Sequence, residues 1–189
     1  YYDGQRSGLP VGRLYNSGNE IDMTMEMVVD ALLDPSSEIT TVLCYAEGLR
    51  RPDLFIQAAR KAQRLGKRIV LLKSGVTPAG AKAAAAHTAS LSGEDRVYDG
   101  VLHELGVARA RGYANLLDMA RVLVAYPRPF GPRASILSIS GGVGIMLTDA
   151  LERAGMGLAT FGETVLAGID TLLPAFLGRN NPLDVSGGP

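Results

Sequence analysis

The sequence predicts an α/β protein in which helices cover both faces of a mostly parallel sheet. Short runs rich in β-branched and aliphatic residues alternate with longer segments of helical periodicity, which is typical of βαβ units. Residues 68–72 show almost no polar alternation, as expected for a central strand that is buried on both faces. Hydrophobic residues make up 47% of the chain and charged residues 20%, which is enough apolar content for a globular core.

The first part of the chain is predicted to contain three strands and two helices. Helices are recognised by apolar residues three or four positions apart, and strands by short runs of β-branched and aliphatic residues. Asp22 is placed to cap the first helix, and Gly66 is placed to end the second. The expected elements are a strand at 11–15, a polar turn at 16–22, a helix at 25–33, a strand at 40–45, a helix at 54–65 and a strand at 68–72.

A long segment of Gly, Ala, Ser and Thr at 74–93 follows the central strand and contains His87. It is predicted to be a functional or mobile loop, in which the alanines of 79–86 also favour a partial helix. Ser92 and Asp95 resemble a capping box. The helix that it opens is expected to bury Val97, Val101, Leu102 and Leu105, and another helix is expected at 113–125.

The prolines at 127–132 predict a stiff connector between two domains. The first domain is predicted at 1–126, and 133–189 is predicted to be the start of a second α/β domain that is incomplete. This second part is expected to contain a strand at 134–139, a glycine-rich turn at 140–144 and a helix at 145–154 that buries Leu147, Ala150 and Leu151. Both ends of the sequence suggest a portion of a longer polypeptide.

Charge and composition exclude several classes of protein. Nineteen basic and nineteen acidic residues give a formal charge of zero without a basic block, which argues against a nucleic-acid partner. The least polar long stretch is too short and too rich in Ser and Gly to span a membrane. Cys44 is the single cysteine, so the sequence predicts no disulfide, no cysteine-rich metal site and a reducing cytoplasm.

Two residues with catalytic chemistry follow predicted strands. Glu47 comes after the strand at 40–45 and His87 after the strand at 68–72, so both are expected at the sheet edge where open α/β folds bind ligands. A carboxylate beside an imidazole can orient and activate a nucleophilic nitrogen. The alternatives remain open: His87 as a surface residue, and Glu47 as a solvated partner of Arg50 or Arg51. His103 lies in a predicted amphipathic helix, where a structural role is favoured.

A glycine-rich turn at Gly141, Gly142, Val143 and Gly144 is the candidate phosphate site. It lies between a predicted strand and a predicted helix, so its amide groups and the positive end of the helix can hold an anion. The turn matches neither familiar nucleotide-binding fingerprint, and close packing is the competing explanation. Lys73 and Lys82 flank the segment of His87, where they either attract phosphate or are solvated surface residues.

Six segments in order resemble the NDP-forming acyl-CoA synthetase superfamily, which includes acetate–CoA ligase (ADP-forming) and succinyl-CoA synthetase. The resemblance spans nearly the whole chain, and its specificity comes from the order of the segments. They are Ser-Gly-Asn-Glu-Ile-Asp at 17–22, Tyr-Ala-Glu-Gly at 45–48, Leu-Lys-Ser-Gly at 72–75, Ala-His-Thr-Ala-Ser-Leu-Ser-Gly at 86–93, Ser-Gly-Gly-Val-Gly at 140–144 and Asn-Pro-Leu-Asp-Val at 181–185.

This resemblance implies a flavodoxin-like domain of an acid–CoA ligase (NDP-forming) that transfers phosphoryl groups through a phosphohistidine. It implies that His87 is phosphorylated, that Glu47 steadies its ring, and that the helix opening at 141–144 points its amino end at the phosphate. CoA, ATP or ADP, phosphate and Mg²⁺ are implied cofactors, bound mainly by CoA-binding and ATP-grasp domains in cis or on another subunit of a homo- or hetero-oligomer. No metal ligands are expected in this chain. Ala89 stands where many relatives have glycine.

Two other functions are compatible with the same residues. One is a noncatalytic acyl-CoA-sensing or acyltransferase-fused regulatory module of the same fold. The other is a flavodoxin-like module that binds flavin or phosphate, which the absence of tryptophan disfavours. The sequence leaves open which acid is activated, whether the nucleotide is ATP or GTP, and whether the enzyme is fused or made of two subunits.

Overall fold

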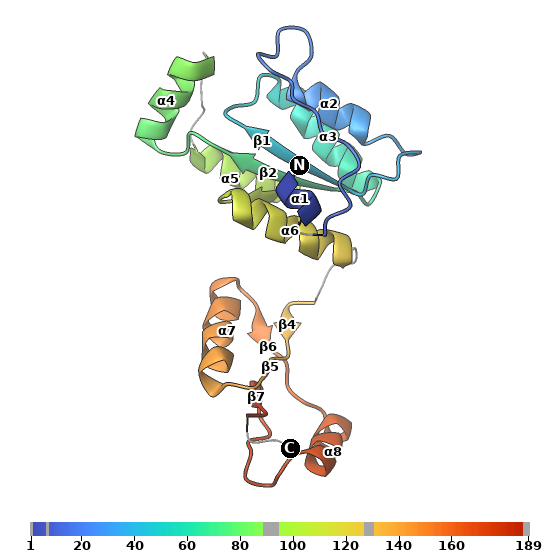
Figure 1. Ribbon diagram of the computed structural model, residues 1–189, viewed down its shortest axis with the longest axis vertical. Coiled ribbons are helices and arrows are strands. Elements are labelled where there is room, and N and C mark those ends of the chain that lie inside the picture. The colour runs from blue at the N-terminus through green and yellow to red at the C-terminus, as the bar shows by residue number, and fades with distance from the viewer. Residues whose placement is uncertain (1, 7, 89–94, 127–130, 187–189) are drawn as a thin grey trace. The chain divides into compact units, whose positions relative to one another are not determined.

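The computed structural model describes residues 2–6, 8–88, 95–126 and 131–186 (Figure 1). Contacts between residues divide the chain into two compact units, Tyr1–Pro127 and Arg128–Pro189, and each is described by itself. Within the described ranges, every helix is too short or too polar to cross a membrane.

The first unit is a three-stranded parallel sheet with helices in the crossovers (Figure 1). The strand order is β1-β2-β3, so β2 is central, which confirms the α/β prediction and the place of the 68–72 strand. Each crossover from one strand to the next passes through a helix. The elements are α1 (Tyr2–Arg6), α2 (Met25–Leu32), β1 (Thr41–Ala46), α3 (Pro52–Arg64), β2 (Arg68–Lys73), α4 (Pro78–Thr88), α5 (Asp95–Glu104), β3 (Ala108–Ala110) and α6 (Tyr113–Ala125).

Apolar side chains cover both faces of β2. Ile69 and Leu71 belong to a large core cluster, whereas Val70, which points to the opposite face, packs with Leu116 of α6. Helices α2, α3 and α5 contribute to the large cluster, so they share one face while α6 covers the other. The large cluster includes Val29, Leu33, Val42, Cys44, Ala46, Phe55, Ala58, Ala59, Ala62 and Leu102.

Helix α3 ends at Gly66 as predicted and begins two residues before the predicted start. Pro52 occupies the first turn, where its missing N–H costs nothing. Gly66 adopts φ 66° after the last turn, and the Lys67 amide donates to the Ala62 carbonyl at 2.9 Å. This is the Schellman arrangement, in which a residue in the left-handed region satisfies the terminal carbonyls.

Several expectations for the first unit are wrong. Residues 11–15 form no strand, and Leu14 and Tyr15 are exposed, because the described part of the chain offers this segment no strand partner. Asp22 does not cap α2; the cap position is Thr24, and the Met25 amide donates instead to Glu20 Oε1 at 3.1 Å.

Two further differences concern the segments around α4 and α5. Residues 78–88 are a regular helix, so the alternative suggested by their alanines is what forms. The Ser92 half of the expected capping box lies outside the described residues. Val97 and Val101 of α5 are exposed, and burial is carried by Leu102 and Leu105. Strand β3 was not predicted, because it is only three residues long and contains Arg109.

The second unit contains two short parallel sheets, β4–β6 and β5–β7. The expected strand at 134–139 is divided in two, and helix α7 begins at Gly141, so the predicted glycine-rich turn is its first turn. Leu147 and Ala150 are exposed, contrary to expectation. The elements are β4 (Arg133–Ala134), β5 (Leu137–Ser138), α7 (Gly141–Arg153), β6 (Gly157–Leu158), α8 (Glu163–Leu172) and β7 (Leu183–Asp184).

The side chain of Asn181 joins the two small sheets. Its Nδ2 donates to the carbonyls of Ala134 at 2.9 Å and Ala159 at 2.8 Å, and its Oδ1 accepts from the amide of Ile136 at 2.9 Å. These are backbone groups at the point where the strand pairing changes from β4–β6 to β5–β7. One amide side chain therefore satisfies the hydrogen bonds that the interrupted strand cannot make.

Candidate functional site

The carboxyl ends of β1 and β2 bring two predicted site segments together. Ala46 and Lys73 are partners in the parallel register, and the amide of Ser74 extends the pairing by donating to the Ala46 carbonyl at 2.9 Å. Glu47 follows β1 directly and is half-buried. The segment that leads to His87 leaves the neighbouring strand at this same edge, and helix α4 then separates His87 from the edge.

Helix α4 carries His87 in its last turn, and small residues pack its start against the end of β2. Thr77 Oγ1 accepts from the Gly80 amide at 3.1 Å, which is an N-terminal cap. Gly75 has φ 67°, and a Cβ added there would lie 3.4 Å from Ala84 Cβ. The turn therefore needs a residue without a side chain. The side chain of His87 lies outside the described part of the structure.

Lys73 is not a solvated lysine, although the sequence suggested a surface position. It is 4% exposed, its Nζ donates to the Ser74 carbonyl at 3.0 Å, and the same atom lies 4.8 Å from the centre of the Tyr98 ring. Burial lowers the pKa of its ammonium group, which the charge of Asp95 partly opposes. Lys73 therefore braces the turn into α4 instead of offering a free charge to phosphate. Lys82 is exposed.

Arg109 on β3 anchors the start of α5. Its side chain is 7% exposed and pairs with Asp95 and, at 2.6 Å, with Asp99 Oδ1. These two aspartates lie one helical turn apart, so the fork of the guanidinium holds the first turn of α5 to the sheet. These ion pairs therefore join the first turn of α5 to β3.

Two acidic residues contact the loop that follows Glu47, and the sequence did not predict either contact. Glu26 is completely buried on α2, and its Oε1 accepts from the Arg51 amide at 3.1 Å. Glu20 adopts φ 53° and lies 3.4 Å from Arg50 Nε through its Oε2. The sequence did contain a signal for Glu26, since it falls three residues before the buried Val29 and thus on the apolar face of the helix.

The single cysteine is not a nucleophile in this fold. Cys44 is buried on β1. Burial raises the pKa of its thiol to about 12, and the nearby Glu26 carboxylate adds to the effect. The thiol therefore stays protonated at neutral pH, where a thiolate is required for attack.

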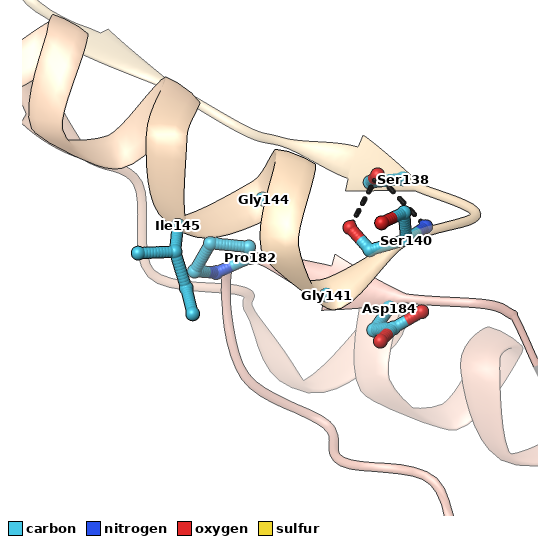
Figure 2. A pocket seen from close by; sticks show the side chains of 7 residues that line it. All are labelled: Ser138, Ser140, Gly141, Gly144, Ile145, Pro182 and Asp184. Atoms are coloured by element: carbon cyan, nitrogen blue, oxygen red, sulfur yellow. Dashed lines mark hydrogen bonds between the residues drawn. The ribbon is translucent and has the colours of Figure 1, made fainter.

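The first turn of α7 lines a pocket of about 220 Å³ in the second unit (Figure 2). This volume is below the roughly 300 Å³ at which pockets for drug-sized ligands begin, so the pocket suits a small group. Ser138 Oγ donates to the Ser140 carbonyl at 2.8 Å and accepts from its amide at 3.1 Å, which fixes the turn before the helix. The lining residues are Ser138, Ser140, Gly141, Gly144, Ile145, Pro182 and Asp184.

A carboxylate already lies beside the amino end of α7. A Cβ added at Gly141 would come within 2.8 Å of Asp184 Oδ2, so the missing side chain makes room for this group (Figure 2). Hydrogen bonds from the backbone and side chain of Ser186 lower the pKa of Asp184. The carboxylate is therefore ionised at neutral pH and repels a phosphate at the same place, while the helix dipole attracts both.

The glycines at the start of α7 differ in what surrounds them, so the absence of a side chain has a different effect at each. The Gly144 amide is bonded to the Ser140 carbonyl at 3.1 Å, and a Cβ on Gly144 would lie 3.1 Å from Pro182 Cβ. A Cβ on Gly142 would meet only Ser140 Oγ, at 3.9 Å. Gly144 thus allows close packing of α7 on Pro182, whereas the amides of Gly141, Gly142 and Val143 belong to the first turn, where helices leave donors free for ligands.

Gly144→Ala is expected to destabilise the second unit by about 1–3 kcal/mol, because the new methyl group overpacks the contact with the rigid Pro182 ring. Gly142→Ala is the matched control, and it is expected to be neutral or slightly stabilising because alanine favours the helix. Amide hydrogen exchange in peptides from α7 measures both effects. Equal protection in the two variants would contradict the packing explanation.

The fold, with a parallel sheet and polar groups at its carboxyl edge, is that of a flavodoxin-like α/β domain. The family model described as the succinyl-CoA ligase like flavodoxin domain matches residues 2–123, and the chain belongs to this family.

Curated relatives and solved structures agree with this assignment. The chain is 34% identical to the alpha subunit of acetate–CoA ligase [ADP-forming] I from Pyrococcus furiosus, over 90% of this chain and 36% of that subunit. It is 30% identical to 4-hydroxybutyrate–CoA ligase [ADP-forming] from Nitrosopumilus maritimus, over 98% of this chain and 26% of that enzyme. A structure of acetyl-coenzyme A synthetase 1 from Ca. Korarchaeum cryptofilum, in complex with phosphate and ADP, superimposes with a TM-score of 0.79 at 30% identity, over 90% of this chain and 37% of that one.

The chain therefore spans between about a quarter and just over a third of the length of these relatives. The NDP-forming acid–CoA ligase family is supported for the chain, and further segments complete the named enzymes.

Proposed function

We propose that this chain is the phosphoryl-carrying part of an NDP-forming acid–CoA ligase, and that His87 is the residue that carries the phosphoryl group. The observation that supports this most directly is the common origin of Glu47 and the segment of His87. They follow neighbouring parallel strands, in a domain whose relatives are ADP-forming CoA ligases. A carboxylate and an imidazole on segments that leave the same sheet edge suit phosphoryl transfer through nitrogen.

In the proposed sequence of steps, phosphate first displaces CoA from an acyl-CoA and gives an acyl phosphate. The unprotonated ring nitrogen of His87 attacks phosphorus, and the bond to the acyl oxygen breaks, so the acid leaves as its carboxylate. Glu47 accepts a hydrogen bond from the other ring N–H. This pairs a negative charge with the phosphorylated ring, which becomes cationic. Attack by ADP then gives ATP and restores His87, and the reverse reaction makes acyl-CoA.

The second unit is proposed to bind phosphate at the first turn of α7. The amides of Gly141, Gly142 and Val143 are the proposed donors, and Gly144 supports the pocket by packing on Pro182. Asp184 opposes the binding, so the carboxylate must turn away or a cation must shield it. CoA, the nucleotide and Mg²⁺ are proposed to be held mainly by CoA-binding and ATP-grasp domains in cis or on another subunit.

The proposed substrate class is a small organic acid, since the named relatives act on acetate and 4-hydroxybutyrate. The proposed compartment is the cytoplasm, where one buried cysteine stays reduced.

A coupled assay of the full-length protein tests the ligase activity. Incubation with acetate or 4-hydroxybutyrate, CoA, ATP and Mg²⁺ is expected to yield the thioester, ADP and phosphate in equal amounts. Binding of acyl-CoA without formation of ADP, with either acid, would favour the noncatalytic module instead.

A further inference from the structure

The loop that follows Glu47 is held at three consecutive residues by side chains from three other segments. Each contact fixes a different residue, and together they leave the loop little freedom. The Leu49 amide donates to Tyr98 Oη at 3.4 Å, Arg50 Nε lies 3.4 Å from Glu20 Oε2, and the Arg51 amide donates to Glu26 Oε1 at 3.1 Å. These partners come from α5, from the turn before α2, and from α2 itself.

Glu26 is costly for the fold, which makes a purely structural role a poor explanation. Its side chain has no exposed surface, and its Oε2 has no hydrogen-bond partner among the residues that the structure describes. A buried carboxylate oxygen without a partner costs free energy that a leucine at this position would not. The Glu26 carboxylate is close enough to the buried Cys44 to help raise the pKa of that thiol, and Val29 on the same helix is also buried. The interaction that Glu26 provides in this position is the hydrogen bond that it accepts from the Arg51 amide.

Glu20, which pairs with Arg50 of this loop, has an unfavourable backbone conformation. It is the residue other than glycine with positive φ in the described backbone, at 53°, a conformation that side chains rarely adopt. Its Oε1 accepts from Ser17 Oγ at 2.8 Å and from the Met25 amide at 3.1 Å, while Oε2 pairs with Arg50. Strain of this kind concentrates where surrounding contacts determine a functional geometry.

We propose that Glu26 is a positioning residue for the phosphoryl-transfer reaction, because its hydrogen bond with the Arg51 amide holds the Glu47 carboxylate in place. The Glu20–Arg50 ion pair restrains the same loop at a second point. This inference rests on the proposed function, because it concerns the residue that orients His87. Glu26 touches no substrate. Its effect is geometric, since a displacement of the oriented group by about 1 Å can cost about 10²-fold in rate.

The test compares Glu26→Leu with Glu26→Gln in the full-length protein. Leucine fills the same space without an acceptor, whereas glutamine keeps one oxygen for the Arg51 amide. With [γ-³²P]ATP and Mg²⁺, the rate of protein labelling per folded molecule in Glu26→Leu is expected to fall about 10- to 100-fold at saturating ATP, with the KM for ATP unchanged. Glu26→Gln is expected to stay within about threefold of the wild type, because the hydrogen bond is restored.

Arg50→Met supplies a second variant in case Glu26→Leu does not fold. It removes the partly exposed ion pair with Glu20 and leaves the core intact, and Arg60→Met, on the exposed face of α3, is its matched control. Labelling is expected to slow about three- to tenfold in Arg50→Met, and to be unchanged in Arg60→Met, with equal melting temperatures.

The outcomes separate this inference from the proposed function. Absence of labelling in the wild type would remove the proposed function itself. Normal labelling of the wild type with an equal rate in Glu26→Leu, or a rate in Glu26→Gln as low as in Glu26→Leu, would overturn the positioning role alone. If Glu26→Leu is unfolded, an Arg50→Met rate equal to that of Arg60→Met would overturn it.

Discussion

Replacement of His87 by alanine is expected to abolish transfer of phosphate from ATP to the protein. The imidazole nitrogen is the proposed nucleophile, and an alanine side chain offers no atom that can form the bond to phosphorus. Full-length protein incubated with [γ-³²P]ATP and Mg²⁺ should carry a label that is lost in acid and retained in base, as a phosphorus–nitrogen bond requires. The variant should keep less than about 1% of this label, because it lacks the proposed nucleophile.

His103 is the matched control, because the chain contains only these two histidines. It is exposed on α5, so His103→Ala should fold normally and keep the label. A label that survives in His87→Ala, or that disappears in His103→Ala, would remove His87 from the proposed mechanism.

Replacement of Asn181 by alanine is expected to destabilise the second unit by about 2–4 kcal/mol, because three hydrogen bonds are lost and the backbone groups that they satisfy are left without partners. The groups belong to Ala134, Ile136 and Ala159, on both sides of the break between β4 and β5. Hydrogen exchange of peptides from 133–139 and 157–160 should accelerate about 30- to 1,000-fold, which is the same free energy expressed as an equilibrium constant.

The adjacent Asn180 provides a control of the same residue type. It is exposed, so Asn180→Ala should leave exchange in both peptides within about twofold of the wild type. If Asn181→Ala behaved like Asn180→Ala, the two small sheets would be held together by packing and not by the amide of Asn181.

The elements that the sequence predicted correctly are those whose signals are local. Gly66 ends α3 because the left-handed region near φ 66° satisfies the last carbonyls, and the uninterrupted apolar run at 69–72 identifies the central strand. Strand formation at 11–15 failed as a prediction because strands require a neighbour, which a single segment cannot reveal. The divided strand at 134–139 depends likewise on Asn181, more than forty residues away in sequence.

In the candidate site, too, local signals were predictable from the sequence and contacts between distant residues were not. Strand ends located Glu47 and the segment of His87, and the resemblance to a ligase family supplied their proposed roles. The partners of the loop were not predictable from the chain alone, because the contact of Glu26 with Arg51 joins residues from two different helix starts. The buried state of Lys73 was also missed, since a strand end usually exposes a long charged side chain and here Tyr98 covers it.

The alanine content of α4 gives this helix a weak hold on the rest of the first unit. Among its described side chains, only Ala84 is buried, whereas α3 buries Phe55 and three alanines. A single methyl group contributes about 0.8 kcal/mol of apolar burial, and one hydrogen bond to a charged group contributes about 1.5–3 kcal/mol. Under the proposed function, one hydrogen bond to a phosphoryl group on His87 would contribute more free energy than the burial of Ala84, so phosphorylation of the histidine and the position of α4 would be thermodynamically linked.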